Sequence, residues 1–234
     1  MKNKDYINLV EFWNQSFQLS EEDKKEFDQI NEDDDYSQLA PSPKLYDVLT
    51  KFNGLENVLD YGCGTGWASI ILAKSNVKHI TAVDVASNSI EMTNCYAKAF
   101  KVSDLITSFP IDENWIKNEK EDTYGGFYSS NVIDVIPLEM AEEIIKESAR
   151  IVKKNAHVVF SLNYYIDPKE MEKRGCVVSD KSIYINGVLR LTALTDEEWK
   201  AIFEKYYGVV SLSYFSWPGE NKETRRIFIL KPLK

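Results

Sequence analysis

A glycine-rich segment follows a short apolar run in the sequence NVLDYGCGTGW, residues 57–67. Its glycines occupy alternate positions, Gly62, Gly64 and Gly66, and an acid, Asp60, stands two residues before the first of them. Glycine permits positive φ angles and lets the backbone pass close to a ligand, and the N–H groups at a helix start bind anions. An acid just upstream suits a ligand that is cationic or rich in hydrogen-bond donors. The segment therefore predicts a strand–turn–helix site for a nucleotide-like ligand.

A second acid, Asp84, ends the apolar run of ITAVDV, 18 residues after Gly66. At the carboxyl end of a strand, such an acid can accept hydrogen bonds from ribose hydroxyls, in NAD and in adenosyl ligands alike. We expect a strand-end acid of this kind to lie outside the core. A dinucleotide fingerprint needs a third glycine at position 67, where the chain has Trp67.

From residue 57 onward, β-rich runs and helical windows alternate along the chain. The β-rich runs are NVLDY, HITAVDV, DLITSF, GGFYSSNV and AHVVFSLN. The helical windows are GWASIILAKS, SNSIEMTNCYAKAF and PLEMAEEIIKESARIV. This alternation predicts an α/β fold with a doubly wound, mostly parallel sheet and helices on both faces. Near the C-terminus, GVVSLSYF and TRRIFIL are separated only by SWPGENKE. A parallel crossover needs about a dozen residues, so these last two strands should pair antiparallel.

Two further segments frame this sheet. We divide the chain into an N-terminal helical extension or lid, residues 1–42, and a ligand-binding domain, residues 43–234. In the extension we expect a helix near residues 5–18 and another begun by Ser20, with Asp23 completing its capping box. Residues 176–194 contain Asn186-Gly187 between β-rich runs and predict a β-hairpin insertion.

Together, VLDYGCGTG and AVDVASNSIEM resemble motifs I and II of class I, Rossmann-like S-adenosylmethionine-dependent methyltransferases. The resemblance covers roughly residues 43–163 and the terminal hairpin, because this family has a seven-stranded sheet whose last strand is antiparallel. It implies that S-adenosylmethionine is the cofactor and S-adenosylhomocysteine the product.

The resemblance also implies where the cofactor binds, always after the carboxyl ends of strands. Its methionine and ribose part would be lined by Asp60, Gly62, Cys63, Gly64 and Gly66. The adenosine would contact Asp84 through the ribose diol, together with Val85, Ile111 and Asp112. The reacting end would lie near Ser130, Asn131 and Val132.

Departures from family patterns narrow the chemistry. The segment after the fourth strand reads SSNV rather than the (D/N)PP(Y/F/W) of amino-directed DNA and glutamine methyltransferases. His79 and His157 both precede predicted strands, at the wrong edge of the sheet for catalysis. Asn131 and Asn163 stand where a metal-assisted site would have acids, so we expect no metal.

No general base stands out, and no catalytic residue is identified. Methyl transfer needs chiefly the alignment of a nucleophile with the methyl group, which can lower the barrier by ~7–11 kcal/mol. An amine, a thiolate or an acidic hydroxyl would need little more. We therefore expect a small-molecule acceptor with an N, O or S nucleophile.

Candidate substrate residues lie in the segments after the fifth strand and around the insertion. They are Tyr164, Tyr165, Arg190 and Trp217, with Trp13 from the N-terminal extension. Each aromatic residue could instead serve plain packing, and Arg190 could simply point outward from its strand. Phe12, Trp13 and Phe17 recur at helical spacing, as a lid or as a satellite core.

Composition limits the class of protein. The chain has 234 residues, of which 44% are hydrophobic, as expected for one ordinary domain. No apolar run reaches the ~20 residues of a membrane span, and the N-terminus lacks a signal peptide's apolar core. Three scattered cysteines fit a reduced, cytoplasmic protein. Residues 1–35 hold 11 acids and 4 bases, most of the net charge of −9, so nucleic acid is an unlikely partner.

Other functions compete with an enzyme of this class. A sensor or scaffold could bind S-adenosylmethionine or its product without turnover, using the same glycine turn and Asp84. A nicotinamide-dependent oxidoreductase conflicts with Trp67 and with the terminal hairpin. Methylation of RNA or protein remains open, and the oligomeric state is undetermined.

Overall fold

A computed structural model describes residues 4–234; residues 1–3 of the predicted N-terminal extension lie outside the described residues. The main sheet has the order β3-β2-β1-β4-β5-β10-β9. Its strands are β1 (Val58–Tyr61), β2 (Ile80–Asp84), β3 (Ile106–Pro110), β4 (Tyr124–Ser130), β5 (Val152–Leu162), β9 (Tyr207–Phe215) and β10 (Arg225–Pro232). The first five are parallel, whereas β10 pairs antiparallel with both β5 and β9. The predicted sheet and its antiparallel end are confirmed.

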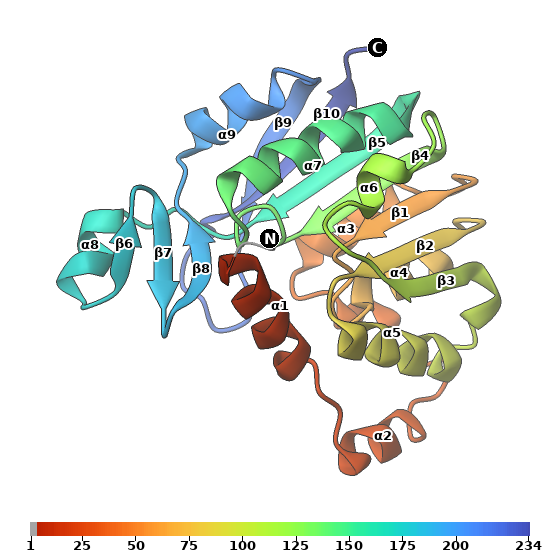
Figure 1. The fold of residues 1–234 in the computed structure, drawn as a ribbon. Coiled ribbons are helices and arrows are strands. Elements are labelled where there is room, and N and C mark those ends of the chain that lie inside the picture. The colour runs from red at the N-terminus through yellow and green to blue at the C-terminus, as the bar shows by residue number, and fades with distance from the viewer. Residues whose placement is uncertain (1–3) are drawn as a thin grey trace.

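Helices cover both faces of this sheet, and each face has its own core (Figure 1). On one face, Leu59 and Tyr61 of β1 join the core built with α7 and α9, while on the other Val58 joins the core built with α3, α4 and α5. The period of two along a strand sends neighbouring side chains to opposite faces, so a strand buried on both sides is apolar throughout. The helices are α3 (Pro43–Thr50), α4 (Trp67–Lys74), α5 (Ser87–Ala99), α6 (Trp115–Asn118), α7 (Leu138–Ile151) and α9 (Asp196–Phe203), with a 3₁₀ turn η2 (Ser103–Leu105) before β3.

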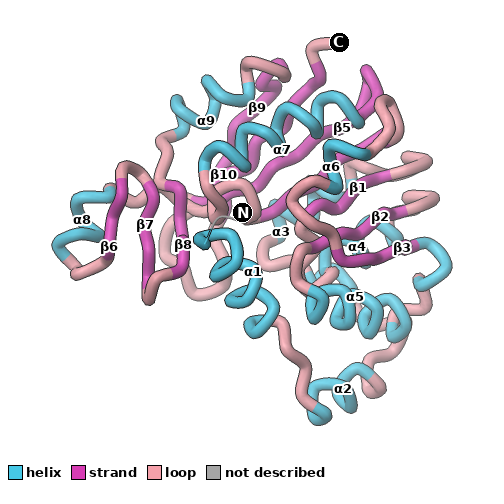
Figure 2. Tube along the Cα trace, viewed as in Figure 1, coloured by secondary structure: helices cyan, strands magenta, loops and turns pink. Residues whose placement is uncertain are grey.

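The insertion is larger than the predicted hairpin. It forms a separate three-stranded sheet, order β6-β7-β8, preceded by a short helix (Figure 2). Its elements are α8 (Pro168–Lys173), β6 (Val177–Ser179), β7 (Ser182–Ile185) and β8 (Val188–Thr192). Asn186 and Gly187 have φ of 53° and 76°, the two positive values that a type I′ turn requires. A second tight turn, with Asp180 at φ 54°, adds β6 to the expected hairpin.

The N-terminal segment contains α1 (Lys4–Ser16), α2 (Glu21–Phe27) and a 3₁₀ turn η1 (Tyr36–Leu39). The predicted capping box is present: Asp23 N–H donates to Ser20 Oγ, and Ser20 N–H donates to the Asp23 carboxylate. Helix α1 crosses the carboxyl ends of the strands, between the insertion and α5, and contacts both β8 and α5 (Figure 1). It is thereby placed over the edge of the sheet where ligands of such folds bind.

Within residues 4–234, no helix combines the length and the apolarity needed to cross a membrane.

Candidate functional site

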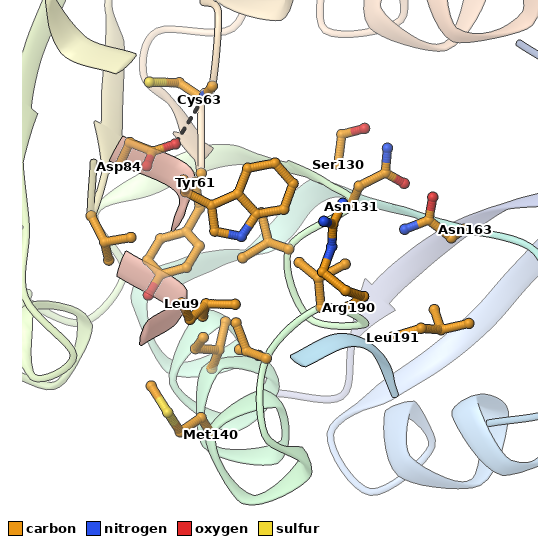
Figure 3. A pocket seen from close by; sticks show the side chains of 18 of the residues that line it. Leu9, Tyr61, Cys63, Asp84, Ser130, Asn131, Met140, Asn163, Arg190 and Leu191 are labelled. Carbon is orange, nitrogen blue, oxygen red and sulfur yellow. Dashed lines mark hydrogen bonds between the residues drawn. The ribbon is translucent and has the colours of Figure 1, made fainter. Parts of the chain in front are cut away.

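A cavity of about 900 Å³ opens at the carboxyl ends of the parallel strands. Its walls come from the glycine turn after β1, the loops after β2 to β5, α1, α7, the insertion and the β9–β10 connection. Most predicted site residues line it: Asp60, Gly62, Cys63, Gly64, Asp84, Val85, Ile111, Ser130, Asn131, Trp13, Tyr164, Arg190 and Trp217. Gly66, Asp112 and Tyr165 are not among its lining residues. Figure 3 shows Asp84 and Cys63 at one end, and Arg190, Asn131 and Asn163 at the other.

The glycines of the turn have distinct structural roles. Gly62 has φ 75°, and a Cβ there would lie 2.2 Å from Val132 Cγ2, so the backbone and the loop after β4 are in direct contact. Gly64, at φ 54°, donates its N–H to Asp84 Oδ2 at 2.9 Å. Gly66 is the N-cap residue of α4 at φ 82°, and a Cβ there would meet Thr93 of α5 at under 3 Å. Gly66 therefore serves helix packing, which explains its absence from the cavity wall.

Asp84 is buried rather than peripheral, contrary to the expectation for a strand-end acid. Its Oδ1 accepts the Ala86 N–H at 2.9 Å and its Oδ2 accepts the Gly64 N–H at 2.9 Å. Burial raises the pKa of this carboxyl, and these hydrogen bonds oppose the shift. A carboxylate has about four acceptor sites, more than these two backbone donors fill.

Asp60 lies below the turn, almost fully buried, and accepts a hydrogen bond from Ser69 Oγ at 2.6 Å. Burial raises its pKa to about 7, with the nearby Asp84 carboxylate adding to the shift. Burial likewise raises the pKa of the Cys63 thiol, which keeps that sulfur protonated and unreactive. Among the described residues, the glycine-turn end of the cavity thus has two acids and no cation between them.

After β3, Glu113 rather than the predicted Asp112 lines the cavity. Asp112 is exposed and accepts the Asn114 N–H at 2.9 Å, so it shapes the turn rather than the cavity. Ile111 and Glu113 line the cavity instead. Glu113 interacts with Tyr6 of α1, and burial together with this carboxylate raises the pKa of the Tyr6 hydroxyl. The sequence DEN offers two adjacent acids, and only the turn geometry decides which one faces inward.

The ends of β4 and β5 form a polar patch in the cavity. Ser161 Oγ donates to Ser130 Oγ at 2.7 Å, and Asn131 adopts a positive φ of 55°. Asn131 Oδ1 is buried and has no hydrogen-bond partner within the described residues. Both the backbone and the side chain of Asn163 are held by hydrogen bonds: its N–H donates to Asp134 Oδ2, and its Oδ1 accepts from Arg225 Nη1. Asn131 thus presents an acceptor that awaits a donor.

The acceptor-side wall is aromatic and apolar. Trp217 and Tyr164 flank the Arg225 guanidinium, with ring centroids 3.6 and 5.3 Å from its Cζ. Glu220 forms an ion pair with the same guanidinium at 2.7 Å. Tyr165, predicted for this wall, is an exposed side chain outside the cavity lining, whereas its neighbour Tyr164 lines the cavity.

Several lining residues were not predicted from the sequence. They are Tyr6, Leu9, Phe17, Tyr61, Thr65, Glu113, Ile136, Glu139, Met140, Glu143, Ile183, Leu191 and Arg225. The periodicity of the first helix included Phe17, and the paired acids after β3 included Glu113. Nothing in the local sequence distinguishes Arg225, since the antiparallel pairing of β10 with β5 brings it beside Asn163.

A seven-stranded sheet with this order, a glycine turn after β1, an acid ending β2 and an antiparallel last strand define a class I methyltransferase fold. Residues 23–174 match the model of a methyltransferase-domain family, which is well over half of the chain, and the chain belongs to that family. The matched family is one of methyltransferase domains, and solved S-adenosylmethionine-dependent methyltransferases share its fold.

Similarity to individual proteins is more limited. Over 57 residues, the chain is 37% identical to ribosomal protein L11 methyltransferase of Legionella pneumophila, covering 24% of this chain and 20% of that protein. The chain therefore matches only about a fifth of this relative's length. An S-adenosylmethionine-dependent methyltransferase from Mesorhizobium loti superposes with a TM-score of 0.61 at 14% identity, over 86% of this chain and 100% of that one. The N-methyltransferase NodS from Bradyrhizobium japonicum gives 0.59 at 14%, over 86% and 99%. These identities support the shared fold alone.

Proposed function

We propose that this methyltransferase acts on a small-molecule acceptor with an N, O or S nucleophile. One observation carries the proposal: the cavity that begins at the glycine turn and Asp84 continues into an apolar, aromatic chamber walled by α1, α7 and the insertion. A chamber of about 900 Å³ in total suits a cofactor together with a small acceptor.

The residues present fit S-adenosylmethionine. Gly62 and Gly64 bring bare backbone to the cavity, and Asp60 and Asp84 supply carboxyl groups that can accept hydrogen bonds from the ligand. The buried, partnerless Asn131 Oδ1 requires a donor such as an ammonium group. We assign cofactor binding to Asp60, Gly62, Cys63, Gly64, Asp84, Val85, Ile111, Ser130 and Asn131, with Glu113 in the place predicted for Asp112.

When bound, the cofactor supplies a methyl group to the acceptor's lone pair, while the carbon–sulfur bonding electrons remain on sulfur. The protein's own residues contribute alignment and exclusion of water. Ser130, Asn131 and Asn163 fix the polar end of the cavity, and Tyr164 and Trp217 form a wall held rigid by Arg225. We identify no general base, so a nucleophile that is acidic or already free of its proton is favoured.

We further propose that residues 1–42 act as a lid on the domain of residues 43–234. Trp13 and Phe17 line the cavity from the N-terminal side, and removing this segment would open it to solvent. The three free cysteines, Cys63, Cys95 and Cys176, support a reducing, cytoplasmic setting.

Calorimetric titration with S-adenosylmethionine, S-adenosylhomocysteine and NAD tests the cofactor assignment. We expect the two adenosyl ligands to bind and NAD to fail. Screening small amines, thiols and phenols for S-adenosylhomocysteine formation then tests the acceptor class. Cofactor binding without turnover on any acceptor would instead favour a sensor or scaffold, and preferential turnover of RNA or protein would overturn the proposed acceptor class.

A further inference from the structure

The cavity is lined within residues 4–234 by three cationic side chains, Lys117, Arg190 and Arg225. Two of them have anionic partners: Lys117 Nζ lies 3.9 Å from Glu143, and Arg225 forms an ion pair with Glu220 and donates to Asn163. Arg190 has neither an ion pair nor a hydrogen bond among the described residues. Its charge is therefore available to a ligand.

Arg190 projects into the cavity because of its position in the small sheet. Leu189 and Leu191, its neighbours on β8, are buried, whereas Arg190 is half-buried between the sheet and α1. The β7–β8 pairing is irregular here: Leu189 and Leu191 pair with the adjacent residues Tyr184 and Ile183, which leaves Arg190 without a paired residue on β7. Arg190 lines the cavity at this irregularity (Figure 3). A side chain in this setting is shielded from bulk water without being neutralised.

The contacts of Arg190 are aromatic. Its Cζ lies 4.2 Å from the centroid of Phe12 and 5.9 Å from that of Trp13, both on α1. Such cation–π contacts hold the guanidinium in place but give its N–H groups no carboxylate or carbonyl acceptor. A guanidinium fixed in this way is preorganised to bind a carboxylate with two parallel hydrogen bonds.

The distribution of charge indicates which ligand brings that carboxylate. Within residues 4–234, five acids line the cavity: Asp60 and Asp84 at the glycine-turn end, Glu113 after β3, and Glu139 and Glu143 on α7. Figure 3 shows Asp84 apart from Arg190. The immediate contacts of Arg190 are the rings of Phe12 and Trp13, so a charge pair there is weakly screened, and Asn131 and Asn163 lie on the same side of the cavity. The Arg190 end is therefore complementary to an anionic group on an otherwise apolar molecule.

We propose that Arg190 binds the carboxylate of the methyl acceptor, so that the substrates of this enzyme are small, largely apolar carboxylic acids that also bear the nucleophile. This inference rests on the proposed function and refines its acceptor class. Arg190 is a specificity-determining residue, and α1 contributes by holding its guanidinium through Phe12 and Trp13.

The test uses the full chain saturated with S-adenosylhomocysteine and titrated with benzoate or with benzamide, which is similar in shape but uncharged. Wild type should bind benzoate at least tenfold more tightly than benzamide. Arg190→Gln should abolish this preference, and Arg190→Lys should retain part of it. Arg174→Gln, an exposed change in the insertion outside the cavity lining, controls for loss of net charge and should behave as wild type.

Thermal unfolding and binding of S-adenosylhomocysteine verify that each variant is folded. A wild type without preference for benzoate, or a preference that survives in Arg190→Gln, would overturn the proposal. The cofactor's own carboxylate is the other possible source of the anion. 5′-Methylthioadenosine lacks that carboxylate. If Arg190→Gln weakens the binding of S-adenosylhomocysteine tenfold but leaves the binding of 5′-methylthioadenosine unchanged, Arg190 belongs to the cofactor site and the proposal fails. Failure of wild type to bind S-adenosylhomocysteine would instead contradict the proposed function itself.

Discussion

At the scale of single residues, the carboxylate of Asp84 has two roles, one in holding the backbone and one in lining the cavity. It accepts the N–H groups of Gly64 and Ala86, which fixes the glycine turn against the start of α5, and it faces the cavity. A residue that only bound ligand could be replaced at little structural cost. Because Asp84 also satisfies two backbone donors, a substitution should affect both the binding of the cofactor and the stability of the protein.

We predict that Asp84→Asn weakens the binding of S-adenosylhomocysteine at least tenfold and lowers the free energy of unfolding by about 1–3 kcal/mol. The amide would turn its NH₂ group toward one of the two backbone donors, leaving a buried donor without a partner. Calorimetry and urea unfolding measure the two effects. Asp112→Asn, the same change on an exposed acid outside the cavity, should leave both near wild type; equal affinity in Asp84→Asn would remove Asp84 from the site.

Gly62 allows a second prediction, because two features of its position disfavour any side chain: its positive φ and its contact with Val132. In Gly62→Ala, the residue must keep φ 75°, at about 1–2 kcal/mol, and its Cβ must displace Val132, at about 1–3 kcal/mol more. Gly54→Ala, at φ 78° with no atom within 4 Å, isolates the backbone cost. Thermal unfolding should rank Gly62→Ala below Gly54→Ala, and Val132→Ala should partly rescue the former. Equal losses in both variants would mean that the contact with Val132 is relieved freely.

At the scale of elements, α1 joins the two ends of the cavity. Asn14 Oδ1 accepts from Ser87 Oγ and from the Asn88 N–H, both at 3.1 Å, which attaches α1 to the start of α5 just after Asp84. Phe12 and Trp13 contact Arg190 of the insertion. A lid with these contacts should close more firmly when the cofactor end is occupied.

Asn14→Ala should therefore loosen α1. Losing two hydrogen bonds of about 1 kcal/mol each should speed amide hydrogen exchange in residues 4–16 by an order of magnitude or more. Gln15→Ala, an exposed neighbour, serves as the control and should exchange as wild type does. S-adenosylhomocysteine should slow exchange of α1 in wild type; if α1 exchanges equally in all variants and is unaffected by the ligand, it is no lid.

At the scale of the whole molecule, the acidity near the N-terminus is largely a solvated surface, partly tied to the domain by Lys24–Glu91 and Lys101–Glu32 ion pairs. Such exposed pairs contribute little to stability. The buried acids affect stability more than these exposed pairs do, because the charged forms of the buried acids are destabilised in the folded state. Their effect on stability depends on pH.

Asp60 makes the sign of that dependence testable. Its folded pKa of about 7 lies above the ordinary value of 3.8, so the folded state holds the proton more tightly than the unfolded chain does. Its contribution to stability is fully present below about pH 4 and is lost as the pH rises toward 7. In Asp60→Asn, urea unfolding between pH 4 and 8 should show a less negative slope of unfolding free energy against pH than wild type. Parallel slopes would mean that Asp60 is ionised without penalty.

Local patterns were sufficient for much of the architecture. The alternation of strand and helix windows, the short connection before TRRIFIL and the Asn186-Gly187 turn each reflect forces within a few residues of one another. Strand β6 of the insertion goes beyond the predicted hairpin: its three residues, Val177–Ser179, are β-branched in part but too few to predict a separate strand. The residues that line the cavity at the glycine turn and after β2 were predictable, since they cluster in two motifs at strand ends.

The sequence by itself determined the sheet and the glycine turn, because backbone conformation and hydrophobic periodicity are local properties, whereas the class of cofactor came from the resemblance of its motifs to a known family. Only the tertiary structure decided that Gly66 packs on Thr93, that Glu113 rather than Asp112 faces inward, and that Arg225 is neutralised while Arg190 is not. These outcomes depend on partners distant in sequence, Glu220 and Asn163 for one arginine and α1 for the other. Whether a charge is free for a ligand is set by everything packed around it, and no local pattern encodes that.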